Sequence, residues 1–468
     1  MAIEAYIVYP TNKYNRPAPS TIALHGLDGS PLQIHNHRFF HRPTSPFSDV
    51  IDKLKSSLAE ALELYPPVAG TVEANENGDV YIAVDTKNAS GTPFLVDTKE
   101  TPYVGDSESL SPRTDVVLPL SSTVLAVKVT QFSCGTIAVA ASINHQATDL
   151  CGFLDFLQLW AQLARGETID FTTIPDVWAR NPGRFFPGLI KEPTLTAPPL
   201  PPLPPFKIFP VPTEPPPSFT APSAVSRWKF TKSAMERLKN DFSPSASSNE
   251  HESDLWISSG DALATLICGA ITRARESGNV ARLEGRSGVE SQTEYIMMAA
   301  DGRDRAPQGN MSNGQYFGNF NPLWSATISR SDLLSATCVS ASRVALAFRK
   351  ALSLDLTPQV IADKISFLED PRNTKPHGRI GFSADIILTN WCRFDLQGPK
   401  LDFGWGKPFR STDGGGSIFP PGYSIMTQEK DSGDVSVMMT VELGGAEALK
   451  ADSLLNSYAT LVLENPAS

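Results

Sequence analysis

Hydrophobic residues in the first half of the chain follow two periods, one typical of helices and one typical of strands. Residues 48–64 carry apolar side chains at helical spacing, and Ser48 is placed to cap that helix. A second apolar stripe predicts a helix over residues 151–165. Period-two patterns predict strands at residues 32–39, 124–132 and 136–144. The first half therefore predicts helices packed on a sheet.

The second half of the chain alternates between the same two periods. Strands are predicted at residues 224–230, 294–300, 384–394 and 434–441. Helices are predicted at residues 259–275, 333–353 and 447–463. Irregular alternation of strands and helices in both halves is typical of layered domains with mixed sheets. We expect an α/β fold of the layered α+β kind, with two domains of similar build.

The strongest shift in composition lies between residues 193 and 222, where 13 of 30 residues are proline. Proline lacks an amide donor and fixes φ, so this stretch is neither helix nor central strand. At about 3.1 Å per residue it could span up to roughly 90 Å. It is either a crossover between two domains or a proline-rich ligand for a partner protein. Apolar residues such as Leu200 and Phe206 could anchor it and favour the crossover, which gives domains at 1–190 and 224–468 joined by 191–223.

Composition and charge exclude several other classes of protein. With 41% hydrophobic and 19% charged residues and a net charge of −10, the chain is typical of a globular protein, and no basic run suggests nucleic acid. No secretory signal and no apolar run of membrane-spanning length is visible, so a cytoplasmic protein is expected. A monomer is the default expectation. The five cysteines lack a C-x-x-C pair, and His35, His37 and His41 lack a carboxylate at ligand spacing. We therefore expect no metal.

The first chemical candidate is His145 together with Asp149, between a predicted strand that ends at Asn144 and the helix that begins near Cys151. Histidine titrates near neutral pH and can act as a general base toward an alcohol. Asp149 could fix the local turn or the tautomer of the ring. Chance supplies roughly 0.4 such pairs in a chain of this length, so a helix-capping Asp beside a core histidine explains the pattern equally well. Cys151 could be a thiol nucleophile, but a buried cysteine is favoured.

A second, more specific motif is Asp402-Phe403-Gly404-Trp405-Gly406. Two glycines beside a tryptophan indicate backbone angles that other residues resist, with a large ring held between them. The motif offers no obvious nucleophile or base. It therefore predicts a rigid structural loop.

Taken together, the two motifs resemble the BAHD acyltransferases of plants and fungi. Further segments match this family in order along nearly the whole chain, at residues 64–70, 301–303, 316–319 and 389–393. The chain departs from many members at Leu150, where they have glycine, at Asn390, where they have serine, and in its long crossover. The general pattern is similar to fungal members such as the trichothecene acetyltransferases.

The resemblance implies two domains of the chloramphenicol-acetyltransferase type with a channel between them. His145 would take the proton of a hydroxyl or amine acceptor as that acceptor attacks the thioester of acyl-CoA, with acetyl-CoA favoured.

 The acceptor would be a small secondary metabolite, and no permanently bound cofactor is implied. By the same resemblance, the Trp391 indole N–H would hold the oxyanion, with Thr389 nearby.

The resemblance also implies structural roles for the remaining motif residues. Asp149 would point away from the channel and stabilise its loop, and Asp402 would pair with an arginine of the Arg303 segment. Two alternatives stay open. The chain could be a same-fold enzyme that no longer transfers acyl groups, such as a cyclase, or a metabolite-binding protein.

Overall fold

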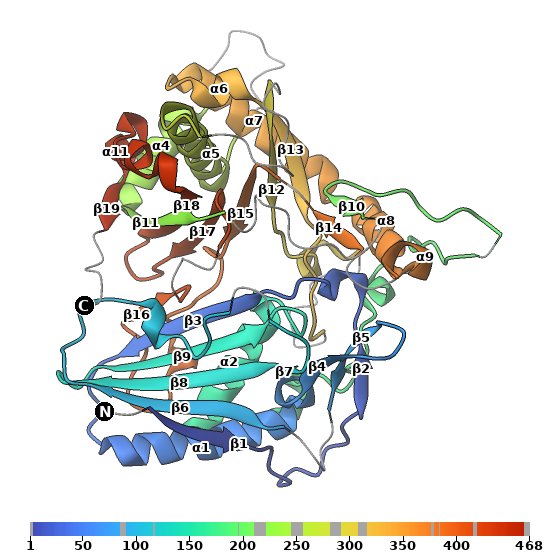
Figure 1. Cartoon of the computed structure of the whole chain (residues 1–468), viewed down its shortest axis with the longest axis vertical. Coiled ribbons are helices and arrows are strands. Elements are labelled where there is room, and N and C mark those ends of the chain that lie inside the picture. The colour runs from blue at the N-terminus through green and yellow to red at the C-terminus, as the bar shows by residue number, and fades with distance from the viewer. Residues whose placement is uncertain are drawn as a thin grey trace.

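The fold is built from two large mixed sheets, each covered by helices (Figure 1). The computed structural model describes residues 3–84, 90–115, 118–194, 196–209, 221–244, 256–280, 292–307, 316–375, 379–382, 384–414 and 419–462. This arrangement confirms the predicted two-domain α/β fold with mixed sheets and flanking helices.

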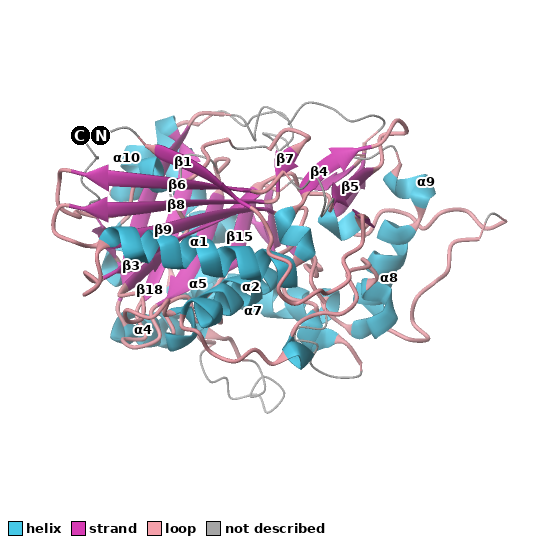
Figure 2. Cartoon of the chain, turned by 90° about the horizontal axis from the view of Figure 1, so that it is seen from below, coloured by secondary structure: helices cyan, strands magenta, loops and turns pink. Residues whose placement is uncertain are grey.

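The first sheet has the strand order β1-β6-β8-β9-β3-β16, in which β6 and β8 are parallel and the other pairs antiparallel. Helices α1 and α2 lie side by side over it (Figure 2), and the Trp160 indole N–H of α2 donates to the Leu54 carbonyl of α1 at 3.1 Å. Their apolar stripes and the sheet form one core. The bounds are β1 (Glu4–Val8), β3 (Gln33–Phe40), α1 (Phe47–Leu64), β6 (Thr92–Lys99), β8 (Leu125–Phe132), β9 (Ile137–Asn144), α2 (Leu150–Ala164) and β16 (Arg410–Thr412).

The second sheet has the order β13-β12-β15-β17-β18-β11-β19, with β12, β15 and β17 parallel to one another. Its strands are β11 (Ser223–Phe230), β12 (Thr293–Met298), β13 (Trp324–Ser329), β15 (Ile386–Asn390), β17 (Tyr423–Gln428), β18 (Val435–Glu442) and β19 (Thr460–Val462). The helices of this half are α4 (Lys232–Phe242), α5 (Ser259–Ser277), α6 (Arg330–Leu334), α7 (Cys338–Asp355), α8 (Pro358–Glu369), α9 (Pro371–Thr374), α10 (Ala446–Lys450) and α11 (Ser453–Tyr458).

Two smaller sheets complete the fold. One contains β2 (Thr21–Ala23), β4 (Thr71–Ala74), β5 (Val80–Ala83) and β7 (Ser122–Thr123). The other is a two-stranded ribbon of β10 (Phe206–Ile208) and β14 (Ile380–Phe382). The proline-rich segment therefore contributes a strand of its own, while residues 210–220 within it lie outside the described part of the chain.

A segment of the second half crosses over to the first sheet. Strand β16 pairs antiparallel with β3, where it forms the edge of that sheet (Figure 1). Leu396, Leu401 and Phe403, which precede β16, lie in the apolar core of the first half. A strand of the second half thus belongs to the sheet of the first half, in addition to the covalent connection through the proline-rich segment.

Three sequence predictions of local structure are wrong. The expected helix at 447–463 is two short helices, α10 and α11, followed by β19, and the expected helix at 333–353 is divided into α6 and α7. Ser48 does not cap α1, because the helix begins one residue earlier and Pro46 occupies the cap position without a side-chain bond. The remaining predicted strands and helices occur within a few residues of their expected bounds.

No helix in the described ranges is long and apolar enough to cross a membrane. Across the same residues, no group of three or more histidine, cysteine, aspartate or glutamate side chains is arranged to hold a metal ion.

Candidate active site

A cavity of about 1550 Å³ lies between the two sheets. Its walls come from the junction of β9 and α2, from the ends of β12, β15 and β17, and from the β10–β14 ribbon. His145, Thr389 and Trp391 all line it. The structure thus brings these three predicted site residues to one cavity, although 244 or more residues separate His145 from the other two.

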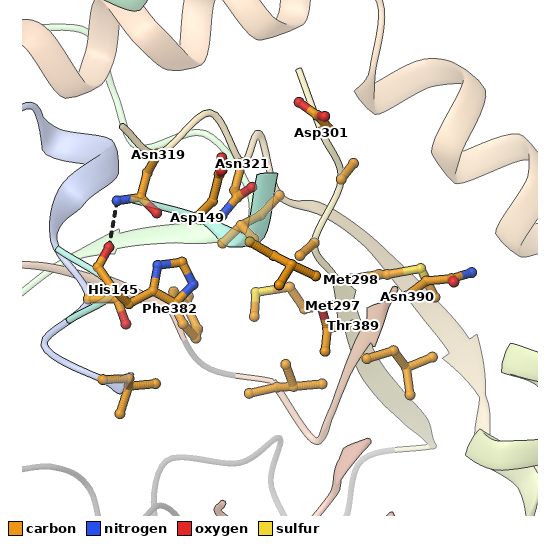
Figure 3. A pocket seen from close by; sticks show the side chains of 18 of the residues that line it. His145, Asp149, Met297, Met298, Asp301, Asn319, Asn321, Phe382, Thr389 and Asn390 are labelled. Atoms are coloured by element: carbon orange, nitrogen blue, oxygen red, sulfur yellow. Dashed lines mark hydrogen bonds between the residues drawn. The ribbon is translucent and has the colours of Figure 1, made fainter. Parts of the chain in front are cut away.

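His145 is the first residue after β9, and its backbone is held from both sides. Its N–H donates to the Leu32 carbonyl at 2.9 Å, and its carbonyl accepts from the Asn319 side-chain amide at 2.6 Å. The ring is half-buried, and its Nδ1 is buried without a hydrogen-bond partner among the described residues. Figure 3 shows the ring at the cavity wall, with Phe382 close by and Thr389 and Asn390 farther along the cavity.

Asp149 caps α2 and binds the second half of the chain. Its carboxylate accepts from the Gly152 N–H at 3.2 Å and forms a two-pronged pair with Arg303, at 2.8 and 3.1 Å. It also accepts from the Phe320 N–H at 2.9 Å. Burial opposes its ionisation, but Arg303 and these amides together hold the pKa of Asp149 below its usual value. The carboxylate therefore fixes the turn and the two halves rather than the ring of His145.

A second buried carboxylate, that of Asp28, is linked to His145 through Asn319. Asp28 accepts from the backbone N–H and the side-chain amide of Asn319, at 3.0 and 2.7 Å. Asn319 in turn holds the carbonyl of His145, and both Asn319 and Asp28 are buried. In the sequence, residues 316–319 stand out only through the family resemblance, and Asp28 does not stand out at all. No spacing signal could have found a pair 291 residues apart.

Thr389 and Trp391 lie at the end of β15. The backbone N–H of Trp391 donates to the Met426 carbonyl of β17 at 2.8 Å. This bond fixes the backbone just after β15 ends. The Trp391 side chain is buried and contributes to the core of the first half. Both residues line the cavity that His145 also lines.

The loop at 402–406 is a structural element away from the cavity. The Asp402 carboxylate accepts from the backbone N–H groups of Gly404, Trp405 and Gly406, at 2.6, 3.0 and 2.9 Å. Both glycines have φ angles near the left-handed region, +103° and +105°, and Trp405 stacks on Phe403 with 5.7 Å between ring centroids. Asp402 was expected to pair with an arginine of the Arg303 segment. Its carboxylate instead binds the amides of its own loop, and Arg303 binds Asp149 and Asp301.

Neither the cysteine nor the histidine alternative gains support from the geometry. Cys151 lines the cavity, but burial raises the pKa of its thiol to about 12, so the thiolate nucleophile is disfavoured. His35 contacts Ser142 at 2.6 Å, while His37 contacts Asp106 and Ser111 at 2.7 and 3.0 Å. These rings are engaged in the interior of the first half.

Comparison with known proteins gives the chain a family. Its residues 2–452 match the model described as the Transferase family. A hydroxycinnamoyltransferase from Narcissus pseudonarcissus is 26% identical over 438 residues, which cover 89% of this chain and 90% of that protein. An acetyl-CoA-benzylalcohol acetyltransferase from Clarkia breweri is 23% identical over 424 residues, 87% of each chain.

A solved structure shows the same fold. TRI101 of F. sporotrichioides, complexed with coenzyme A and T-2, superposes with a TM-score of 0.72 at 18% identity, covering 94% of this chain and 99% of that one. The family model spans nearly the whole sequence, and the cavity and the motif loops lie within the matched residues. The chain therefore belongs to the Transferase family, that of the BAHD acyltransferases, and is an acyltransferase.

Proposed function

We propose that this enzyme transfers an acyl group, with acetyl favoured, from acyl-CoA to a hydroxyl or amine of a small secondary metabolite. The observation that carries the proposal is the half-buried ring of His145 in a large cavity that Thr389 and Trp391 also line. The names of the Clarkia relative and the ligands of TRI101 support an acyl-CoA donor. A cytoplasmic monomer remains our expectation.

The proposed reaction needs one base and one site for negative charge. Because Nδ1 of His145 is buried, Nε2 is the nitrogen that accepts the acceptor's proton as the acceptor oxygen or nitrogen attacks the thioester carbon. The tetrahedral oxyanion is held by the Trp391 indole N–H, with the Thr389 hydroxyl nearby. Collapse of this intermediate breaks the carbon–sulfur bond, and the imidazolium returns the proton to the departing thiolate of CoA.

The magnitudes expected for these roles guide the test. General base catalysis contributes about 10²–10⁴-fold, and one oxyanion donor about 2.7–4 kcal/mol. Asp149, Arg303, Asp402, Gly404, Trp405 and Gly406 would act only by holding the structure. Acid–base and oxyanion contributions are thus assigned to His145, Trp391 and Thr389. Asp149 and Arg303 also line the cavity, but their charged groups are bound to each other and, for Arg303, to Asp301.

The test is release of free CoA thiol from acetyl-CoA in the presence of a panel of alcohols and amines. His145→Ala should lose at least about 10²-fold in kcat, and Trp391→Phe, which removes only the indole donor, should lose a comparable factor. His41→Ala is the matched control, since His41 is exposed and stacks on Phe409 away from the cavity. A His145→Ala variant with normal turnover would sink the proposal and favour a cyclase or a binding protein.

A further inference from the structure

The cavity has one charged end, which follows from the direction of three strands. Because β12, β15 and β17 are parallel, their carboxyl ends lie at one edge of the second sheet. Cavity-lining residues just beyond these ends are charged, namely Asp301, Asp304, Arg305, Arg393 and Lys430. Arg393, which follows β15, forms ion pairs with Asp301 and Asp304, which follow β12. The charged residues after these two strands therefore form one cluster.

The opposite end of the same strands is apolar. Phe382 precedes β15 in the chain, and Phe419 stacks on Tyr423, the first residue of β17, with 4.6 Å between ring centroids. All three line the cavity. Five residues of β15 extend about 16 Å at roughly 3.3 Å per residue, so the apolar and charged ends are well separated. His145 and Phe382 both line the cavity, and Figure 3 draws them on the same side of the view, with Thr389 and Asn390 beyond.

The proline-rich crossover builds part of this apolar wall. Phe206 of β10 pairs with Phe382 of β14, and Phe209 extends the ribbon because its N–H donates to the Arg379 carbonyl at 2.7 Å. A Cβ on Gly381 would come within 2.8 Å of the Phe209 ring, so the absence of a side chain there lets the ring lie against the ribbon. The aromatic wall is thus fixed by backbone pairing.

The volume of the cavity bears on what can bind there. Pockets for drug-sized ligands usually measure about 300–1,000 Å³. A volume of about 1550 Å³ exceeds that range and accommodates the narrow thiol arm of a donor together with a bulky second substrate. At the charged end, Arg305 and Lys430 add positive charge beside the cluster of Arg393, Asp301 and Asp304, which suits the anionic donor and leaves the aromatic end for the acceptor.

We infer that the acceptor is a bulky, apolar alcohol or amine that binds between His145 and the β10–β14 ribbon, with Phe382 and Phe209 setting its size. This inference rests on the proposed function, which it extends to a substrate class. A small acceptor would leave the aromatic wall in contact with water, and a polyhydroxylated one would place hydroxyl groups against the rings of Phe382 and Phe209.

The experiment uses the full chain, acetyl-CoA and four secondary alcohols: cyclohexanol, borneol, testosterone and shikimate. We expect kcat/KM to rise at least about tenfold from cyclohexanol to borneol or testosterone, and shikimate to be the poorest acceptor. Phe382→Ala and Phe209→Ala should each lower kcat/KM for the preferred alcohol about tenfold and leave the KM for acetyl-CoA within about twofold. Phe171→Ala, which truncates an exposed ring outside the cavity, is the matched control and should change neither value.

The possible failures are distinguishable. Preference for shikimate, or equal use of borneol by wild type and both ribbon variants, overturns the inference and leaves acyl transfer standing. If no alcohol releases CoA, calorimetric titration of the protein with testosterone decides. Binding that weakens at least about tenfold in Phe382→Ala and not in Phe171→Ala supports the apolar site without acyl transfer. No binding, or equal binding by wild type and Phe382→Ala, overturns it.

Discussion

The side-chain amide of Asn319 donates a 2.6 Å hydrogen bond to the backbone carbonyl of His145 and so ties the second half of the chain to the residue at the end of β9. The same amide donates to buried Asp28 at 2.7 Å. Asn319→Ala removes both bonds, and we expect kcat to fall about 10²-fold because small displacements of a reacting group are that costly. The KM for acyl-CoA should change little, which steady-state kinetics would measure.

Asn373 supplies the matched control for this variant. It is also buried, and its side-chain amide donates to the carbonyls of Phe367 and Leu200 at 3.0 and 3.2 Å, outside the cavity lining. Asn373→Ala should lose comparable thermal stability and keep kcat. Equal losses of kcat in the two variants would mean that Asn319 acts only through general stability.

The pair of Asp149 and Arg303 predicts an acid-dependent loss of stability. Asp149→Asn leaves a buried guanidinium without its partner, which costs about 3–5 kcal/mol. Because the folded pKa of Asp149 is below the usual 3.8, its charge stabilises the fold above that pH and the contribution disappears as the pH falls through the folded pKa. The wild type should therefore keep its advantage over Asp149→Asn down to about pH 4 and lose it progressively between about pH 4 and pH 2. Urea unfolding across that range measures it, and an advantage that persists unchanged at about pH 2 would contradict the ion-pair account.

Local patterns in the sequence were sufficient for most elements that carry the site. Helices α1 and α2 follow from apolar spacing because each presents one face to the core of the first half. Strands β3, β8 and β9 follow from it because apolar residues on one face of each enter the same core, although β3 and β9 are buried on both faces. The position of His145 at a strand–helix junction follows from the same patterns. Resemblance, and not spacing, supplied Thr389 and Trp391.

Contacts across the two halves were beyond such patterns. Strand β16 is only three residues long, and its partner β3 lies more than 370 positions away. Asp28 contacts Asn319 across 291 positions, and both are ordinary polar residues in their own local sequence. The two strands of the β10–β14 ribbon could not be predicted either, because three residues are too few to show a hydrophobic period. Tertiary packing alone defines these features.

In the loop at 402–406, replacing a glycine by alanine should lower the stability of the fold through backbone strain alone, without a steric clash. Gly406 has φ +105° with no atom within 4 Å of an added Cβ, so Gly406→Ala tests the conformation alone and should cost about 1–3 kcal/mol. Gly404→Ala should cost about the same, because the Lys53 amine that its Cβ would meet at 2.6 Å is the end of a flexible side chain and can move. Gly444→Ala, at an ordinary φ with room for a methyl group, is the control in the same unfolding experiment. Equal stability of all three variants would show that the loop is not held in this conformation.

His35 predicts a second pH effect. His35 is neutral in the folded protein whereas Asp149 is charged, yet in both cases the stability of the fold decreases as the pH falls. Burial, followed by the nearby charges of His37 and Arg113, lowers the pKa of His35 to about 3, although Asp106 opposes this. An unfolded histidine takes up a proton near pH 6.5, so the unfolded state binds more protons from there down to about pH 3 and stability falls by up to about 1.4 kcal/mol per pH unit. His35→Gln should be less stable at pH 7, because Ser142 loses its 2.6 Å contact with the ring, yet its stability should fall less steeply below pH 6.5. His41→Gln changes an exposed ring and should keep the wild-type slope. Urea unfolding at pH 7, 6 and 5 compares the three proteins, and an unchanged slope in His35→Gln would rule out His35 as the titrating group.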